Sequence, residues 1–538
     1  MKRKPIAMIL FSLLLLVFAA GFLFSASSSK TPEQETIVIA MPRSALIRNM
    51  DTNYYKLWLE EQTGLSLRFL FLEDGYTPEY LSNAFANGDV RVDAFFSLNV
   101  GDDYLTALAA LQDYGEKGYI LPLNPYLEES TNLSQIFRRF DSYDLQKIMT
   151  ASDGNLYFMP GLDASRGQRA KHVFWINKGW LSALRLSVPQ TTDQLRQVLE
   201  AFSTLDPNGN GIADEIPLCG TLAADGQELY NAIINSFIYA DPENSYLLLQ
   251  NGHVVFAPET DAWRQAMQYL NSLYRDGLIS PLLPELSSRS FSELANSPAD
   301  ILGGFTANRI TDVLMQNSPE VISNFIHVPP LAGPEGQCNA TEHIPFPNIA
   351  GVIPSTCCNP QAVFDLLDRM LSEQAFLIGR YGEETVDWET AKLTDMDFYG
   401  RNATVRIINQ LANKVQNKHI GELGPFFAYP QYADGVSFAG LESDQEYINA
   451  RAVGAYAPYM PDEHLGTALY RADTAAELQV LRRQIDAYTE ARIVDFITGA
   501  LDPFDDAQWD SVVRRYDALG LPRFLAVAQA SYTEMMGD

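Results

Sequence analysis

The chain has 538 residues and a formal net charge of −29 at pH 7. This acidity argues against nucleic acid and anionic lipid as partners, because both bind basic surfaces. Hydrophobic residues make up 47% of the chain, which excludes intrinsic disorder, and the length predicts more than one domain or lobe.

The N-terminus has the three parts of an export signal. Basic residues within Met1–Lys4 are followed by an uncharged apolar run from Pro5 to Phe24, and then by small residues that include Ser27. We therefore expect residues 1–27 to be a signal peptide or an uncleaved membrane anchor, since the run is long enough to span a bilayer. Residues 28–35 are expected to form a linker, and the rest of the chain to be extracellular, at the cell surface.

The first elements of the exported part alternate between strand and helix patterns. In chain order they are the strand Thr36–Met41, the helix Tyr54–Thr63, the strand Leu65–Leu72, the helix Tyr80–Asn87 and the strand Val92–Ser97. Gly64 and Gly88 end the two helices. This β-α-β-α-β order predicts an α/β fold with a parallel sheet.

The same patterns continue along the rest of the chain. Strands are predicted at Leu156–Met159, at Val173–Asn177 and within Asp300–Phe305. Helices are predicted at Lys178–Arg185, Thr191–Ser203, Thr260–Asp276, Pro360–Arg380, Leu478–Ile497 and Trp509–Tyr532. The sequence shows no solenoid repeat, so the elements belong to globular lobes.

A calcium loop is predicted directly after the helix Thr191–Ser203. The first oxygen donors alternate with other residues and are followed by a glycine, as in the first six positions of an EF-hand. The predicted ligands are the side chains of Asp206, Asn208, Asn210, Asp214 and Glu215 and the carbonyl oxygen of Ile212. The twelfth position would be Pro217, which has no side-chain oxygen, so the site is a compact loop and not an EF-hand. The alternative is an Asx and glycine turn that binds nothing.

Catalytic motifs are absent from the sequence. It contains no phosphate-binding P-loop, no dinucleotide fingerprint, and neither an HExxH nor a GxSxG pattern. Acidic pairs such as Asp102-Asp103 and Asp505-Asp506 would suit a glycosidase, but in so acidic a chain they are typical of a solvated surface. We therefore expect no enzymatic activity.

The four cysteines are Cys219, Cys338, Cys357 and Cys358. Export permits disulfides, and Cys338 could pair with either Cys357 or Cys358, between which the sequence does not choose. Unpaired thiols are the alternative, and the spacing fits no zinc site.

Five segments carry a resemblance to a known family. They are Thr52–Gly64, Asp153–Tyr157 with Met159-Pro160, Trp175–Lys178 with Trp180-Leu181, Asp206–Leu218, and Arg380-Tyr381-Gly382 with Asp387-Trp388. In this order the chain resembles the extracellular solute-binding proteins, family 1, of ABC transporters. More narrowly, it is similar to the long Firmicutes-type members that bind oligosaccharides such as alginate. It departs from them at Ala19–Phe22, where Gram-positive members usually carry the cysteine of a lipobox.

The resemblance implies a two-lobed, type II periplasmic-binding-protein-like fold. Each lobe would have a mainly parallel sheet flanked by helices, with the ligand in the cleft between the lobes. The expected bounds are 36–158 plus 340–395 for lobe I, and 159–339 plus 396–538 for lobe II. The resemblance also implies a monomer that serves an ABC importer: it would capture a carbohydrate, expected to be an oligosaccharide, close around it and deliver it to a membrane permease.

A sugar-binding cleft needs aromatic rings that cover apolar sugar faces and polar groups that bind hydroxyls. The candidates are the aromatic residues Tyr157, Trp175, Phe305, Trp388 and Tyr399, with Asn177 and Arg401 as polar partners. For each aromatic residue the alternative is a place in the core. The calcium loop is expected to lie away from the cleft and to stabilise the second lobe.

Three other functions stay open at this stage. The same fold serves as the ligand-binding ectodomain of a sensor, and the missing lipobox cysteine favours that variant. A secreted polysaccharide hydrolase would need two carboxylates that face a cleft. A dockerin-type module would need a second copy of the calcium loop, and the sequence contains one.

Overall fold

The computed structural model describes residues 35–72, 76, 80–81, 83–84, 91–100, 104–139, 145–163, 165, 169–222, 226–314, 319–342, 346–411, 414–438, 440, 445–461, 465 and 475–535. The expected export segment at 1–27, most of the linker at 28–35 and half of the expected helix Tyr80–Asn87 fall outside these residues. Within them, no helix is long and apolar enough to cross a membrane.

The first lobe is built around a sheet that, in the described residues, has the strand order β13-β4-β10-β3-β1-β2. The strands are β1 (Thr36–Pro42), β2 (Ser66–Leu72), β3 (Ala94–Phe96), β4 (Met159–Asp163), β10 (Asn348–Val352) and β13 (Phe426–Ala428). β1 is parallel to β2 and β3, and β13 is parallel to β4, whereas β10 is antiparallel to both of its neighbours. The apolar run of β1 is buried on both faces, as expected for a central parallel strand.

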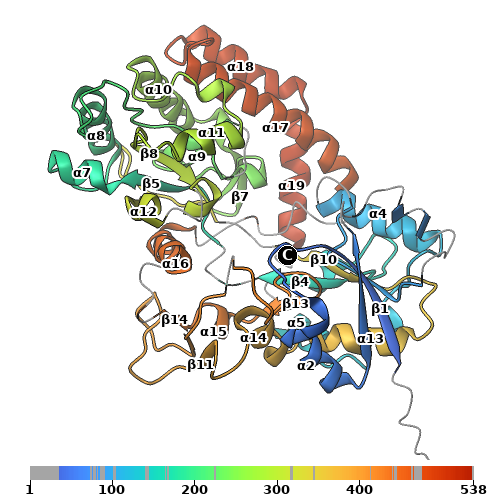
Figure 1. The fold of residues 1–538 in the computed structure, drawn as a ribbon. Coiled ribbons are helices and arrows are strands. Elements are labelled where there is room, and N and C mark those ends of the chain that lie inside the picture. Colours follow the sequence, from blue (N-terminus) through green and yellow to red (C-terminus); the bar gives the residue numbers. More distant parts are fainter. Residues whose placement is uncertain are drawn as a thin grey trace, which may run out of the picture.

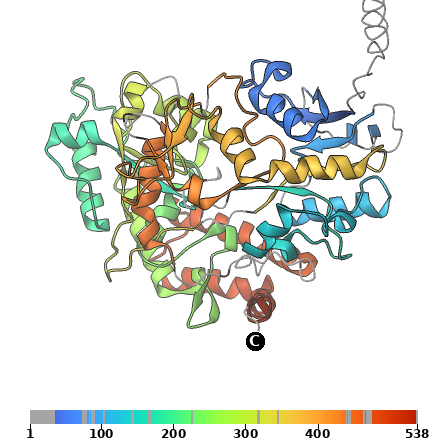
Figure 2. The ribbon, with the colours of Figure 1, turned by 90° about the horizontal axis from the view of Figure 1, so that it is seen from below.

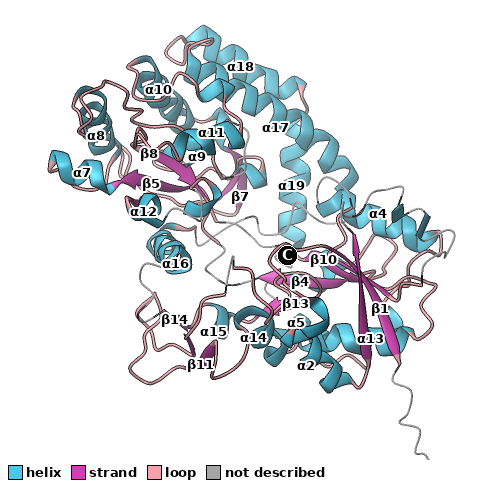
Figure 3. Ribbon diagram, viewed as in Figure 1, coloured by secondary structure: helices cyan, strands magenta, loops and turns pink. Residues whose placement is uncertain are grey.

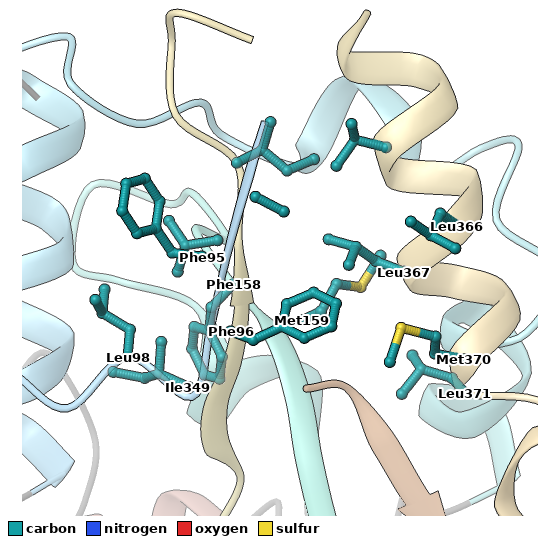
Figure 4. Packing of buried hydrophobic residues seen from close by; sticks show 14 of the residues in the cluster. Phe95, Phe96, Leu98, Phe158, Met159, Ile349, Leu366, Leu367, Met370 and Leu371 are labelled. Atoms are coloured by element: carbon teal, nitrogen blue, oxygen red, sulfur yellow. The ribbon is translucent and has the colours of Figure 1, made fainter. Parts of the chain in front are cut away.

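Helices cover both faces of the first sheet (Figures 1 and 2). They are α2 (Tyr54–Thr63), α4 (Tyr104–Glu116), α5 (Leu133–Arg139), α6 (Leu145–Met149), α13 (Pro360–Met370) and α14 (Glu373–Tyr381). Figure 4 shows Leu367 and Met370 of α13 packed toward Phe96 and Met159 of the sheet. Burial of this apolar layer is the main favourable contribution to the stability of the lobe.

The helix predicted over Pro360–Arg380 is in fact two helices, α13 and α14. The break follows Leu371, and the Ser372 side chain begins α14 by accepting a hydrogen bond from the backbone N–H of Ala375. Leu371 is fully buried, so the apolar pattern runs through the break and does not reveal it.

The second lobe has a smaller sheet with the order β8-β5-β9 in the described residues. Its strands are β5 (Val173–Asn177), β8 (Gly304–Ala307) and β9 (Phe325–Val328), beside a hairpin of β6 (Leu247–Gln250) and β7 (His253–Phe256). β5 is antiparallel to both β8 and β9, which corrects the expectation of a mainly parallel sheet. A central strand buried on both faces has the same apolar pattern whichever way its neighbours run, so the sequence did not show their direction.

The helices of the second lobe pack around this sheet and include the C-terminal ones (Figure 3). They are α7 (Lys178–Leu184), α8 (Thr192–Thr204), α9 (Leu229–Ile234), α10 (Asp261–Arg275), α11 (Ser288–Ala295), α12 (Pro319–Ser323), α16 (Gln445–Tyr456), α17 (Ala475–Thr498), α18 (Asp506–Ala518) and α19 (Leu521–Met535). α17 packs against α10 and α19, so the end of the chain completes the core of this lobe.

A third, small sheet lies beside the first lobe (Figure 1). It consists of β11 (Trp388–Thr390), β12 (Val405–Ile407) and β14 (Val436–Ser437), and the short helix α15 (Pro430–Ala433) precedes β14. Trp388, Val405, Ile407 and Val436 form its own buried cluster. This sheet is close to α14, because Leu377 and Tyr381 pack against that cluster.

Among the described elements, the chain passes between the lobes three times. The first passage joins β4 to β5, the second joins β9 to β10, and the third leads from β13 through β14 to α16. The first two passages meet in an antiparallel bridge between Ala170 and Glu342. The expected bounds gave 396–538 to lobe II, yet β13 pairs with β4 and its residues Phe427 and Ala428 are buried in the core of the first lobe. A three-residue strand has too short a pattern to be assigned to a sheet from sequence.

Candidate ligand cleft and metal loop

A cavity of about 720 Å³ is lined by both lobes. The first lobe contributes side chains of β4, β10, β13, α2 and α14, and the second contributes α16 and the segments around Lys171 and Asn308. This volume is typical of a cleft that holds a small ligand. The three interlobe passages border the cavity, so a ligand in it would contact both lobes.

Partly buried aromatic rings from separate elements line this cavity. They are Phe346, Tyr381, Phe398, Phe426 and Phe438. Phe426 of β13 pairs with Gly161 of β4, and a Cβ atom placed on Gly161 would lie 2.8 Å from the Phe426 ring. Glycine at this position therefore lets the ring lie close over β4, where it forms part of the cleft wall. Such a ring offers a flat apolar face to a sugar.

Hydrogen-bonding side chains share the cleft wall with these rings. Asn308, Asn348, Gln410 and Asn449 line the cavity and come from four separate segments. Amide groups both donate and accept hydrogen bonds, which suits hydroxyl groups. The arrangement can therefore bind a polyhydroxylated ligand through both its apolar and its polar surfaces.

His419 lines the cavity as a neutral group. Its Nδ1 accepts a hydrogen bond from the backbone N–H of Gly421 at 3.0 Å, which assigns the ring proton to Nε2. Nε2 has no hydrogen-bond partner among the described residues. Burial, and then the charge of Arg380, lower the pKa of His419 to about 4. The imidazole is therefore uncharged near neutral pH.

The buried histidine also predicts a pH dependence of stability. The unfolded state takes up a proton on His419 as the pH falls through about 6.5, whereas the folded state does so near pH 4. Stability should therefore fall between these pH values, by up to about 3 kcal/mol from this residue. His419→Asn, which keeps an acceptor for Gly421, should reduce the slope of melting temperature against pH in this window. An unchanged slope would contradict the assignment.

Other buried groups contribute to the same pH profile of the wild-type protein. Burial, and then the charge of Arg451, lower the pKa of His327 to about 4, so its contribution has the same sign. Burial, and then the charge of Glu243, raise the pKa of Asp241 to about 7, which favours the folded state at low pH and opposes the histidines. The comparison of the variant with the wild type isolates the contribution of His419.

Three of the predicted ligand residues are instead fully buried in the second lobe. The Trp175 ring lies in its core, and its Nε1 donates to the carbonyl oxygen of Ala307 at 3.3 Å. Phe305 packs edge-on between Phe291 and Phe325. These two rings support the sheet and do not line the cavity among its described residues.

Asn177 is the N-cap of α7 and is also fully buried. Its Oδ1 accepts from the backbone N–H of Trp180 at 3.1 Å, and its Nδ2 donates to Asp300 Oδ1 at 3.0 Å. Both functions of the amide are thus used within the fold. The prediction of a ligand contact is corrected to a capping role.

Tyr157 is likewise a core residue, of the first lobe. Its ring lies so close to Gly115 that a Cβ atom there would be 2.2 Å from it, and its hydroxyl donates to Asp153 Oδ2 at 2.6 Å. Trp388 lines a different cavity, of about 650 Å³, between α2, α14 and the small sheet. Its Nε1 donates to the carbonyl oxygen of Gly382 at 3.0 Å.

Tyr399 and Arg401 lie next to the cleft without being among its described lining residues. The Arg401 guanidinium stacks on the Tyr399 ring at 4.7 Å and donates to Asp397 Oδ2 at 2.8 Å. Their neighbour Phe398 lines the cavity. The predicted segment therefore lies close to the cavity, but the ring that lines the cavity is Phe398, one residue before Tyr399.

Sequence reasoning missed the residues of the cleft wall that come from distant segments. Arg380, His419 and Phe426 were not candidates, although Arg380-Tyr381-Gly382 was among the segments that carried the family resemblance. That match was the available signal. His419 and Phe426 have no local pattern that distinguishes them from core residues.

The predicted calcium loop closes on itself through its own side chains. Asp206 accepts from the backbone N–H of Asn210 at 3.1 Å and, through Oδ2, from that of Gly211 at 2.9 Å. The amides of Asn208 and Asn210 both point to Asp214 Oδ1, at 3.3 and 3.1 Å. The Asp206 carboxylate thus holds the backbone of the turn, while the two amides point to the carboxylate near the end of the loop.

The loop is attached to the second sheet at the residue that follows it. The backbone N–H of Ile216 donates to the carbonyl oxygen of Ile301 at 2.8 Å, and that of Gly303 donates to the carbonyl oxygen of Ile216 at 2.9 Å. The segment 301–303 leads directly into β8. The loop therefore fixes the entry to an edge strand of the second lobe.

The donor set of the loop fits a hard cation in part. No group of three or more His, Cys, Asp or Glu side chains is arranged to hold a metal in the described residues. The loop does bring the amides of Asn208 and Asn210 to the Asp214 carboxylate, and Glu215 Oε1 is buried without a hydrogen-bond partner. Amide and carbonyl oxygens are ordinary ligands of Ca²⁺, so this chemistry is compatible with calcium.

The four cysteines are free thiols in the structure. Cys357 is buried in the core of the first lobe, whereas Cys338 lies in the second passage between the lobes, with its thiol 3.1 Å from the carbonyl oxygen of Pro330. Burial raises the pKa of the Cys219 and Cys357 thiols to about 11, so neither is a reactive thiolate at neutral pH.

The two lobes, the interlobe passages and the cavity define the fold of the two-lobed solute-binding proteins. Comparison with models of protein families finds no match. The chain is 24% identical over 527 residues to the fructooligosaccharide ABC transporter substrate-binding protein FusA of Streptococcus pneumoniae, which covers 96% of this chain and 89% of FusA. The resemblance predicted from the five segments is confirmed, because the homologues and structural neighbours are substrate-binding proteins of ABC transporters.

Solved structures agree on the fold. FusA in complex with kestose aligns with a TM-score of 0.70 and 21% identity, over 93% of this chain and 99% of that one. The alginate-binding protein AlgQ2 without calcium ion aligns with a TM-score of 0.59 and 18% identity, over 94% and 99%. A further structure of FusA is of an EF-hand mutant in complex with fructo-nystose. The predicted two-lobed α/β fold is therefore confirmed.

Proposed function

We propose that this protein is the extracellular solute-binding component of an ABC importer, which captures an oligosaccharide between its lobes and delivers it to a membrane permease. The observation that carries this proposal is the interlobe cavity, in which aromatic rings such as Phe426 and amides such as Asn308 line one space. The similarity to FusA over nearly the whole chain supports the same function. The protein binds its ligand and releases it unchanged, so it is not an enzyme.

A thermal-shift screen tests this function. A ligand that binds only the folded state raises the melting temperature, by an amount that grows with the ratio of ligand concentration to Kd. We expect a rise with at least one oligosaccharide of three or more units and recovery of that sugar intact after incubation. No shift with any sugar in a broad panel, or cleavage of the sugar that binds, would contradict the proposal.

The loop at 206–215 is proposed to hold a structural Ca²⁺ ion. Its ligands would be the side chains of Asp206, Asn208, Asn210, Asp214 and Glu215 with the carbonyl oxygen of Ile212, once the two amides rotate their oxygens inward. The hydrogen bonds that bring the Asn208 and Asn210 amides to Asp214 support the site, and so does the structure of an EF-hand mutant of the similar protein FusA. The ion would hold Ile216 against the segment 301–303, and so stabilise the second lobe.

Calcium removal should therefore lower stability more than it lowers ligand affinity. We expect EDTA to reduce the melting temperature by several degrees, since saturation at a thousandfold excess over Kd contributes about 4 kcal/mol. The double variant Asp206→Ala with Asn208→Ala should have the lower melting temperature already and should not respond to EDTA. Asp502→Ala is the control, because this loop aspartate caps the backbone N–H of Phe504 but has no such oxygen cluster. A loss of affinity at unchanged stability would contradict the structural role.

A further inference from the structure

The charged side chains in the described wall of the cleft are mostly acidic. The carboxylates are Asp163, Glu243, Asp312, Glu422 and Glu446, and the cations are Lys171, Arg309 and Arg380. Five acidic groups against three basic ones make the described wall negative. The whole chain, at −29, adds a field of the same sign.

Arg380 is the only cation that the first lobe contributes to the described wall. Its Nη1 lies 3.4 Å from Glu422 Oε1. Burial lowers the pKa of Arg380, yet the charges of Glu446, Glu422 and Asp163 raise it above its ordinary value. Glu446 lies on α16, Glu422 in the segment before β13, and Asp163 at the end of β4. Negative charges from three separate parts of the chain therefore act on the Arg380 guanidinium.

The other two cations of the described wall are Lys171 and Arg309. Lys171, which is largely buried, forms an ion pair with Glu243. Arg309 is followed by Asp312, whose Oδ2 accepts from the Arg309 backbone N–H at 2.8 Å. His419 adds no positive charge near neutral pH, because burial lowers its pKa to about 4. Two of the three described cations of the wall, Lys171 and Arg380, are thus paired with carboxylates.

Building on the proposed carbohydrate function, we propose that the cleft selects uncharged oligosaccharides and rejects those that contain uronic acids. Glu422 is the specificity-determining residue in this assignment, because its carboxylate neutralises Arg380 in the cleft wall.

The selection follows from repulsion of the wrong ligand. A uronate carboxylate placed on Arg380 would also lie close to Glu422, and near Glu446 and Asp163, whose charges act on the same guanidinium. Like charges brought together in a partly desolvated cleft repel each other, whereas a sugar hydroxyl accepts from the guanidinium without that repulsion. The carboxylates thus discriminate by penalising one class of ligand.

Calorimetry with matched neutral and acidic sugars tests this assignment. The neutral probes are kestose, nystose and the neutral sugar with the largest thermal shift, and the acidic probes are trigalacturonate and tetragalacturonate. In the wild-type protein we expect the acidic probes to bind at least about tenfold more weakly than the best neutral probe. This preference should decrease at low pH, where the uronates lose charge, and at high salt, which screens the partly exposed carboxylates.

The variant Glu422→Gln should raise the affinity for the acidic probes, relative to the neutral ones, roughly tenfold. Glu446→Gln is a second removal of a carboxylate near Arg380, and it should shift the ratio in the same direction. Glu293→Gln is the matched control, because Glu293 forms an exposed ion pair with Arg289 at 3.1 Å outside the cleft, and its removal should leave the ratio unchanged.

The possible outcomes separate the two proposals. If the wild-type protein binds both classes equally well, the charge selection is wrong and the carbohydrate function stands. If the ratio is the same in both cleft variants as in the wild type, the role of the carboxylates is wrong. If neither class binds, the carbohydrate function fails and the selection fails with it.

Discussion

Replacing Asp368 by alanine should lower the free energy of unfolding of the first lobe by about 3–5 kcal/mol. The Asp368 carboxylate is almost fully buried on α13 and accepts hydrogen bonds from the loop before α5. Its donors are the Ser130 hydroxyl at 2.7 Å and the backbone N–H groups of Thr131, Asn132 and Leu133 at 3.2, 3.0 and 2.9 Å. Truncation would leave these donors without partners, of which those of Ser130 and Leu133 belong to buried residues, and hydrogen bonds to a charged acceptor are among the stronger ones.

Urea unfolding, followed by a probe of the first lobe, measures this loss. Asp365→Ala is the control, since Asp365 is an exposed aspartate on the same helix and accepts one bond from Gln361. We expect the control to differ from the wild type by less than about 0.5 kcal/mol. A similar change in both variants would show that helix propensity, and not the loop attachment, determines the result.

The local elements were predictable where a hydrophobic period and a capping residue coincide. α2 and β5 have the predicted bounds, Tyr54–Thr63 and Val173–Asn177. Thr191 caps α8, because its side chain accepts from the backbone N–H of Gln194 at 3.1 Å. Caps and periods depend on residues three or four positions apart, so one sequence carries the complete signal.

Pairings between distant segments were not available from such signals. β13 has three residues and joins β4 across more than 260 positions of sequence, so its place in the first lobe depends on tertiary packing. The break between α13 and α14 is buried at Leu371 and leaves the apolar pattern intact. In both cases the sequence showed apolar residues correctly but did not show where they pack.

The predicted ligand residues show the same limit of sequence-based prediction. All five residues of β5 are buried, so neither face of that strand reaches the cleft, and Trp175 had to be a core residue. Phe426 resembles a core residue in sequence, and it becomes a wall residue because Gly161 beside it has no side chain. A cleft between lobes is assembled from several passages of the chain, and the family resemblance gave its position but not its residues.

Replacing Phe426 by alanine should weaken oligosaccharide binding by about 2 kcal/mol, or roughly 30-fold in Kd. The ring is partly buried at the edge of the first sheet and faces the interlobe cavity beside Arg380 and Tyr381. A sugar that stacks on it would lose both apolar burial and the aromatic contact. Calorimetry with the neutral sugar that gives the largest thermal shift measures the effect.

Two comparisons separate this contact from a general loss of stability. Phe504→Ala removes a ring that is 52% exposed in the loop before α18, outside the described cleft wall, and should leave affinity unchanged. Gly161→Ala keeps the Phe426 ring but adds a Cβ atom 2.8 Å from it, so the ring must move and affinity should fall. Loss of affinity in both cleft variants, with the Phe504 variant unchanged, would place the sugar on this ring. Unchanged affinity in Phe426→Ala would mean that the ligand is held by other parts of the wall.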